Sequence, residues 1–331
     1  MSRGIILLAM GDPMYGRLAF NAALSMKAND PNIHITLGYA ESALADLFDY
    51  HRSYFDNFIE IPETFYTNYP PPVVTTKPVH TLDDFFAGAP TEAKLTPAPP
   101  CQKNYFKAKT HLYELSPYDQ TIFLDVDSLW KLGKRVNPLL DSLGGVKYTP
   151  VCYQNPKGLP HQGSMQDWEM TKQIGFWASA EQYAAYYGKR TDGYFWETST
   201  YFIYFEKCPE TKAYFDKVQE LMRDPSPDVP VKSYRGDMKP DEFYFNAASY
   251  LLQMGPCTYP YAPIAMYGQI ENNWIKNHYG VTFPGTNGKD YYRMQVKNYQ
   301  RNPSYYTRDP KLRRKPIEEN AHNKKFWLMT K

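Results

Sequence analysis

Apolar positions near the start of the chain follow first a strand pattern and then a helix pattern. Residues 4–9 form a continuous apolar run, which predicts a buried strand. Residues 17–28 carry apolar side chains at helical spacing and predict an amphipathic helix. A second strand is expected over 33–37 and a second helix over 41–49. This alternation is typical of a parallel sheet with helices packed against it.

The pattern changes after this opening unit. Residues 62–100 are rich in proline, threonine and tyrosine, which predicts a long irregular insertion with a short helix at 82–87. Helices are then expected over 104–116, 209–222 and 240–253. Strands are expected over 121–125 and 197–205, and a loop over 153–175. The prediction is an α/β chain with a mixed, mostly parallel Rossmann-like sheet flanked by helices. From residue 284 the apolar periodicity is lost, so we expect a catalytic domain over 1–288 and a basic irregular extension over 289–331.

Two carboxylates lie where the strand at 121–125 ends. Asp125 and Asp127 follow an Ile-Phe-Leu run and are separated by a single residue. Residues i and i+2 of an extended segment point to the same side, so both carboxylates can approach one ion. The carboxyl ends of strands in open α/β sheets are where ligands bind. Mn²⁺ or Mg²⁺ prefers such oxygen ligands and completes its shell with phosphate oxygens. The alternative is a pair of solvated acids in a turn.

Composition agrees with a soluble protein that has a sizeable core. Apolar residues make up 43% of the chain and charged residues 22%. The four cysteines are widely spaced and form no CxxC pair, which favours free thiols in a reducing compartment. The apolar run at 4–9 is too short for a signal peptide or a membrane span, so a cytoplasmic location without membrane contact is expected.

The lysines before the Asp-Val-Asp strand extend the pattern. Lys107 and Lys109 lie on the expected helix, and the strand ending in Asp125 and Asp127 follows. This order resembles the metal-dependent nucleotide-sugar glycosyltransferases of the GT-A fold, in particular the glycogenin-like group. The resemblance implies that the two lysines and Asp125 contact the donor nucleotide. It also implies that Asp125 and Asp127 bind the metal.

The first loop of the chain resembles the same family. In these enzymes the loop after the first strand holds the nucleobase and ribose, and here it contains Gly11, Asp12 and Tyr15. The resemblance implies that Tyr15 stacks on the base. A rim residue at a helix start is the alternative for Tyr15.

Later segments supply further candidates by resemblance. Asn277-His278-Tyr279-Gly280 resembles a His-aromatic-x-Gly element whose histidine is a third metal ligand, although Gly280 comes one position early. Asp241 and Glu242 resemble the acidic helix start that faces the sugar; an ordinary acidic first turn, favoured by the helix dipole, is the alternative. Glu197 stands in a strand that departs from the family pattern. Asp241, Glu242 and Glu197 are the candidates for a catalytic base.

Charge is distributed unevenly along the chain. Residues 289–331 hold twelve Lys/Arg and four Asp/Glu, a net charge of +8, which leaves a net charge of −6 for 1–288. A basic tail with interleaved aromatics favours an anionic partner such as nucleic acid, and a hydroxymethylated DNA base would then be a possible acceptor. A solvated terminus is the alternative. The candidate contacts are Arg301, Arg308, Arg313, Arg314 and Lys315.

The resemblance implies transfer of a sugar from a nucleotide diphosphate donor, expected to be UDP-linked, to a hydroxyl acceptor. A nucleotidyltransferase acting on sugar phosphates is an alternative, but the first loop lacks the basic glycine-rich phosphate pattern expected of it. A non-catalytic nucleic-acid-binding protein is another, and it would leave Asp125 and Asp127 unexplained. The sugar, the acceptor, and retention or inversion at the anomeric carbon stay open.

Overall fold

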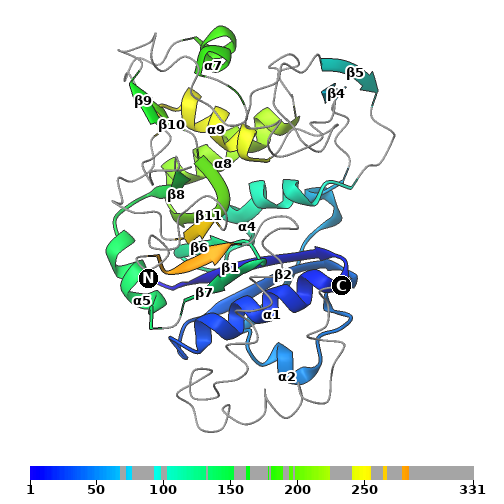
Figure 1. The fold of residues 1–331 in the computed structure, drawn as a ribbon, viewed down its shortest axis with the longest axis vertical. Helices are drawn as coiled ribbons and strands as arrows, with labels where there is room; N and C mark the ends of the chain where they lie inside the picture. Colours follow the sequence, from blue (N-terminus) through cyan, green and yellow to red (C-terminus); the bar gives the residue numbers. More distant parts are fainter. Residues whose placement is uncertain are drawn as a thin grey trace.

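A mixed six-stranded sheet forms the centre of the protein (Figure 1). We describe a computed structural model that covers 1–67, 72–76, 93–97, 103–131, 133–152, 162–164, 178, 180–188, 194–196, 198–223, 241–254, 264–266 and 278–282. The strand order is β3 (Asn57–Glu60), β2 (Ile35–Glu41), β1 (Arg3–Gly11), β6 (Gln120–Leu124), β11 (Thr198–Glu206) and β8 (Tyr148–Cys152). The first four strands in this order run parallel, whereas β11 is antiparallel to both of its neighbours. The predicted α/β class with a mostly parallel sheet is confirmed.

Alternate residues of β1 belong to two separate cores. Ile5 and Leu7 belong to one hydrophobic cluster, while Ile6 and Met10 belong to the other. Because both faces are buried, the strand is apolar throughout, as parallel strands usually are. This is why a continuous apolar run, rather than an alternating one, identified it.

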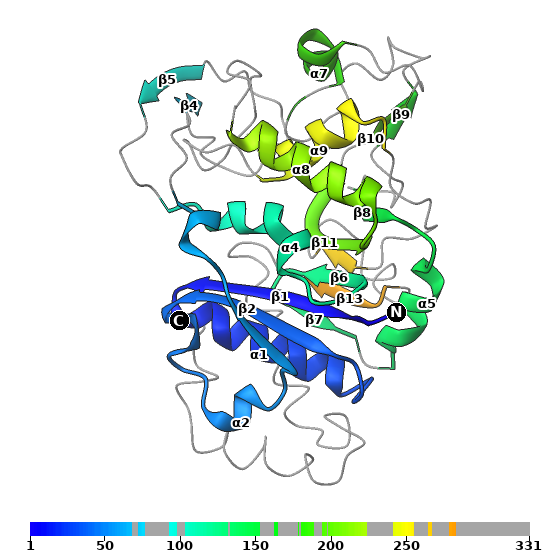
Figure 2. The ribbon, with the colours of Figure 1, turned by 180° about the vertical axis from the view of Figure 1, so that it is seen from behind.

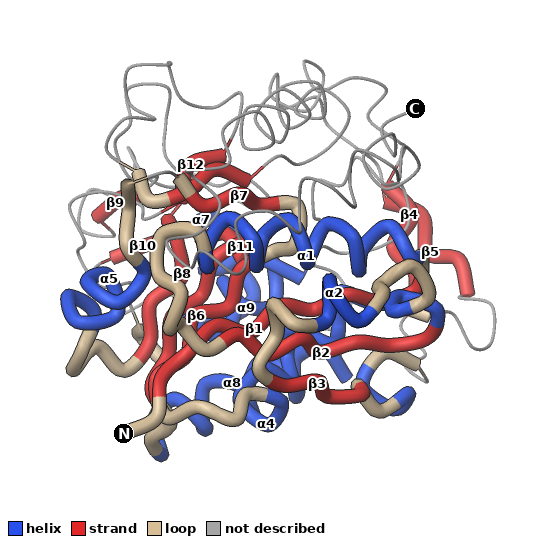
Figure 3. The backbone as a smooth tube through the Cα atoms, turned by 90° about the horizontal axis from the view of Figure 1, so that it is seen from below, coloured by secondary structure: helices blue, strands red, loops and turns tan. Residues whose placement is uncertain are grey.

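Helices cover both faces of the sheet (Figures 2 and 3). One face packs against α1 (Pro13–Lys27), α2 (Asp49–Arg52) and α5 (Val136–Leu143). The other packs against the 3₁₀ helix η3 (Tyr105–His111) with α4 (Leu112–Leu115), α8 (Pro209–Arg223) and α9 (Asp241–Leu251). The remaining elements are η1 (Ser42–Leu44), η2 (Glu63–Phe65), β9 (Gln162–Ser164), β10 (Tyr194–Trp196) and α7 (Ala180–Tyr187). Among the described residues, no helix has the length and apolar character needed to cross a membrane.

Three local expectations differ from the structure. The helix expected at 41–49 is instead the short η1 followed by α2, because Glu41 adopts a positive φ of 58° and turns the chain. The helix expected over 104–116 is mainly 3₁₀. The insertion is not wholly irregular: β4 (Pro72–Thr76) and β5 (Ala93–Pro97) pair as antiparallel strands, consistent with the β-branched residues of β4. The helix expected at 82–87 lies outside the described residues.

A small second sheet was not expected from the sequence. It joins β12 (Ile264–Met266), β13 (Gly280–Thr282) and β7 (Ser128–Trp130), with β7 beginning directly after Asp127. Helix α1 supports β7, because the Trp130 backbone N–H donates to the Ser25 hydroxyl at 2.8 Å. These strands are only three residues long, too short for a periodicity argument.

Candidate active site

Lys109 lies at the centre of a buried charge network at the carboxyl end of β6. Its Nζ is 2.9 Å from Asp125 Oδ1 and 3.2 Å from Asp241 Oδ2. The Thr200 hydroxyl donates to Asp241 Oδ2 at 2.6 Å. The network therefore joins η3, β6, β11 and α9, which are far apart in the sequence. Lys109, Asp125 and Asp241 were each predicted as site residues, and the structure brings them together.

Backbone geometry places Asp125 for this contact. Its N–H donates to the Tyr201 carbonyl at 2.9 Å, and its carbonyl accepts from the Ser128 N–H at 3.1 Å. The pairing of β11 with β8 shifts register between Ser199 and Ile203, and such irregularities re-aim side chains next to active sites. Thr200 lies within that shift, so the irregularity of β11 and the network coincide.

Burial alters the protonation equilibria of the network. Burial raises the pKa of the Asp125 carboxyl to about 7, with Lys109 opposing and Asp127 reinforcing the shift. Burial lowers the pKa of Lys109, but the carboxylates of Asp125, Asp241 and Glu242 raise it by more, so its ammonium stays charged. Two acids with one cation leave negative charge in excess, which favours a further cation here.

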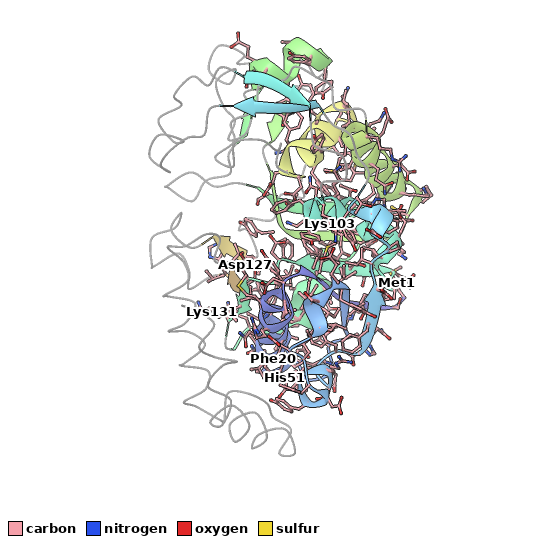
Figure 4. The ribbon with its side chains drawn as sticks, turned by 90° about the vertical axis from the view of Figure 1, so that its right-hand side faces the viewer. Met1, Phe20, His51, Lys103, Asp127 and Lys131 are labelled. Carbon is pink, nitrogen blue, oxygen red and sulfur yellow. The ribbon has the colours of Figure 1, made fainter. Side chains whose placement is uncertain are left out.

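Asp127 lies in the turn between β6 and β7 and contacts the second sheet. The Thr282 hydroxyl donates to Asp127 Oδ1 at 3.1 Å, and Thr282 pairs with Ser128 in the antiparallel β13–β7 ladder. Figure 4 shows Asp127 and Lys131 close to each other, on the same part of the molecule. Thr282 was not predicted. A signal existed, since Phe283 and Gly285 follow Thr282 with the spacing of a His-aromatic-x-Gly element in which threonine replaces the histidine.

His278 lies at the opposite end of β13 from Asp127. Gly280 pairs with Trp130, and the Lys131 N–H donates to the Tyr279 carbonyl, so His278 comes beyond the far end of the ladder. Strand residues rise about 3.3 Å each, which separates His278 from the Asp127 end. Within the described residues, no three His, Cys, Asp or Glu side chains form a group able to hold a metal ion. The predicted ligand set of Asp125, Asp127 and His278 is therefore not assembled.

The first loop forms a capped helix start. Asp12 is the N-cap of α1 and accepts from the Met14 N–H at 2.6 Å, with Pro13 at the first helical position. This cap explains why α1 begins four residues before the predicted start. Gly11 has a φ of 77°, and Tyr15 is exposed at the helix start, where a planar ligand could stack.

A second charge cluster lies at the end of β2, beside this loop. Glu41 is directly opposite Gly11 in the β1–β2 register. Its carboxylate accepts from Tyr105 OH at 2.8 Å and pairs with Lys103 Nζ at 2.5 Å. Tyr105 and Lys109 both lie on η3, so one segment runs from the end of β2 to the end of β6. Glu41 was not predicted, since its positive φ is a conformation that non-glycine residues rarely adopt.

The other predicted residues are less closely tied to the network. Lys107 is buried on η3, and burial lowers its pKa to about 8. Glu242 is half-buried beside Asp241, and burial raises the pKa of its carboxyl well above its usual range. Glu197 and the basic tail residues lie outside the described part of the chain.

Comparison with known proteins gives only distant structural likenesses. No protein-family model matches the sequence, and no curated protein matches it. The apo structure of WbbM, a bifunctional glycosyltransferase, is 13% identical with a TM-score of 0.48, covering 86% of this chain but 46% of WbbM. The galactosyltransferase LgtC with donor and acceptor sugar analogues is 14% identical with a TM-score of 0.43, covering 85% and 87%.

Mouse xyloside xylosyltransferase 1 is 8% identical with a TM-score of 0.37, covering 84% of this chain and 91% of that protein. All three are glycosyltransferases, the class implied by the sequence resemblance. The chain spans less than half the length of WbbM.

Proposed function

We propose that the protein is a metal-dependent glycosyltransferase that moves a sugar from a nucleotide diphosphate donor to a hydroxyl group. The observation that supports this most is the meeting of Lys109, Asp125 and Asp241 at the carboxyl end of β6, with Asp127 two residues away. A buried lysine held by two carboxylates is a costly arrangement. It lies at the sheet edge where α/β proteins bind nucleotides, where such a charge cluster can serve a ligand.

The donor set suits a hard divalent cation. Asp127 offers a half-buried carboxylate, and Asp125 adds a carboxylate that Lys109 neutralises only in part. Oxygen ligands of this type fit Mg²⁺ or Mn²⁺. A bound cation would stabilise negative charge on the leaving diphosphate. Lys109 would add a fixed positive charge beside it, as a preorganised electrostatic group.

The acidic start of α9 supplies the catalytic carboxylate in this proposal. Asp241 is held by Lys109 and Thr200, which fixes its position and occupies Oδ2. Glu242 follows it, is half-buried, and has a raised pKa caused first by burial and then by Asp241. A raised pKa makes a carboxylate a better proton acceptor. We therefore assign Asp241 to positioning and Glu242 to proton transfer at the acceptor hydroxyl, with Glu197 as the alternative.

Gly11, Asp12 and Tyr15 would hold the nucleoside in this proposal. They lie at the end of β1, next to β6 in the sheet order, so a nucleotide could extend from Asp125 toward Tyr15. Lys107 lies on η3 with Lys109 and would add positive charge at the same end of the site.

Metal-dependent donor cleavage tests the proposal. The protein is incubated with UDP-glucose and a panel of other nucleotide sugars with Mn²⁺ or Mg²⁺, and release of free nucleotide is measured with and without EDTA. We expect cleavage that EDTA abolishes and that Asp127→Ala reduces by about 10²-fold or more. Asp141→Ala is the matched control, since Asp141 is an exposed carboxylate on α5 paired with Arg3. No cleavage with any donor would contradict the proposal.

The acceptor and the basic extension form a separate part of the proposal. The net charge of +8 over residues 289–331 supports an anionic acceptor such as DNA bearing hydroxymethylated bases. A salt-dependent gel shift with DNA, lost on truncation at residue 288, is expected. Donor cleavage by the truncated chain would show that the two parts act separately, and undiminished DNA binding after truncation would refute the tail assignment.

A further inference from the structure

The second sheet fixes which residue can share a cation with Asp127. Strand β7 starts directly after Asp127, and β13 pairs with it so that Thr282 lies opposite Ser128. The pairing continues away from the acidic turn through Val281 and Gly280. Thr282 therefore adjoins Asp127, whereas His278 lies beyond the other end of the strand.

We propose that Thr282, and not His278, is the protein ligand that joins the two aspartates at the cation, so that the site is built from oxygen donors and prefers Mg²⁺ to metals that favour nitrogen. This inference rests on the proposed donor site and specifies its metal chemistry. The donor set is the carboxylates of Asp127 and Asp125, the Thr282 hydroxyl and the diphosphate oxygens of the nucleotide.

The spacing of the two protein oxygens matches an octahedral ion. Thr282 Oγ1 and Asp127 Oδ1 are 3.1 Å apart. Two ligands at right angles, each about 2.1 Å from Mg²⁺, lie about 3 Å from each other. The two oxygens therefore already have the separation of neighbouring ligands. Binding requires only that the Thr282 hydroxyl turn its proton away from Asp127, which a hydroxyl can do by rotation.

The backbone holds Thr282 in place for this role. Its strand pairs with β7, and β7 is fixed to α1 by the bond from the Trp130 N–H to Ser25. Thr282 is 1% exposed, so its side chain has little freedom to move. A ligand on a paired strand is more precisely placed than one on a loop. A threonine hydroxyl on Mg²⁺ is also an established ligand type in nucleotide-binding proteins.

The choice of ligand atom predicts metal preference. Carboxylate and hydroxyl oxygens suit Mg²⁺ and Mn²⁺, whereas an imidazole nitrogen favours Ni²⁺, Co²⁺ or Zn²⁺. Metal affinity is measured by isothermal titration of Mg²⁺ or Ni²⁺ into the full chain with saturating UDP, which needs no turnover. We expect Thr282→Val to weaken Mg²⁺ binding about tenfold or more. Thr282→Ser keeps the hydroxyl and should bind as the wild type does.

Two further variants separate the ligand assignments. His278→Ala should leave Mg²⁺ affinity unchanged, and Thr282→His should raise the Ni²⁺-to-Mg²⁺ affinity ratio about tenfold or more. The rise in the affinity ratio of Thr282→His still tests the inference if Thr282→Val destabilises the second sheet. Unchanged Mg²⁺ binding by Thr282→Val, or weakened binding by His278→Ala, would overturn the inference. Wild-type protein that binds neither Mg²⁺ nor UDP would instead contradict the proposed function.

Discussion

Two lysine–carboxylate clusters lie at the same edge of the sheet and differ mainly in burial. Lys109 and Asp241 have side chains that are 10% and 3% exposed, whereas those of Lys103 and Glu41 are 47% and 27% exposed. Asp125, at the rim of the Lys109 cluster, is 29% exposed. One segment, residues 103–109, carries both lysines. The two clusters therefore compare similar ion pairs in a buried and in a solvated environment.

The pKa shifts of the acids run in opposite directions. Burial raises the pKa of Asp125 to about 7, while hydrogen bonds from Lys103 and Tyr105 lower the pKa of Glu41. In the buried cluster desolvation exceeds the stabilisation of charge, and in the exposed cluster it does not. The buried cluster is the one that needs an additional cation, which is why it is the better candidate for the reactive end of the site.

Removing the buried lysine should have the largest effect. Lys109→Met leaves Asp125 and Asp241 without their cation, and breaking a buried pair costs about 3–5 kcal/mol. Urea unfolding measures the change in the free energy of unfolding. Asp241→Asn in the same background should recover part of the loss, because it removes one unpaired charge. A change below about 1 kcal/mol in Lys109→Met would mean that the two clusters are equivalent.

Two buried histidines extend the comparison to pH. Burial lowers the pKa values of His51 and His111 to about 4 in the folded protein, against about 6.5 when unfolded. Figure 4 shows His51 beside Phe20, and the two rings lie 4.7 Å apart. Because the unfolded chain binds these protons first, stability is complete above pH 6.5 and falls as the pH drops toward 4. The expected loss is about 3 kcal/mol for each histidine.

Replacing His51 with glutamine can remove the titration of this side chain and keep its hydrogen bond. His51 Nδ1 accepts from the Phe48 N–H at 3.1 Å at the start of α2, and glutamine makes the same capping contact in many helices. His51→Gln should therefore reduce the loss of stability between pH 6.5 and 4, measured by urea unfolding at both pH values. An unchanged pH dependence would show that His51 is not neutral in the folded protein.

Strain at the exposed cluster predicts a gain in stability. Glu41 has a φ of 58° and a ψ of −131°, a conformation that costs a non-glycine residue about 1–3 kcal/mol. Glu41→Gly removes this strain and loses an exposed ion pair worth about 1 kcal/mol or less. We expect a net gain of about 1 kcal/mol in urea unfolding. Glu60→Gly in β3 is the control and should destabilise by about 0.5–1 kcal/mol.

The comparison also explains how far the sequence could predict the site. Asp125 and Lys109 were predicted from local pattern and resemblance, because each lies on or next to an element with strong periodicity. Thr200 could not be predicted in this way, and for Thr282 the only local signal was the aromatic-x-Gly spacing that follows it. Thr282 reaches Asp127, 155 positions earlier in the chain, because the three-residue strand β13 pairs with β7. Thr200 joins the network at a register shift between β11 and β8. The α/β class followed from the apolar runs, whereas the mainly 3₁₀ form of η3 did not, since helical spacing alone does not distinguish it from an α-helix.

The smallest expected effect is the loss of the exposed lysine. Lys103→Met leaves Glu41 bonded to Tyr105 OH and accessible to water, so the free energy of unfolding should change far less than in Lys109→Met. The effect should shrink further in high salt, because exposed charges are screened within about a Debye length. Urea unfolding at low and high salt measures this. A salt-independent loss as large as that of Lys109→Met would show that Glu41 is as strongly desolvated as Asp125, and the contrast between the two clusters would fail.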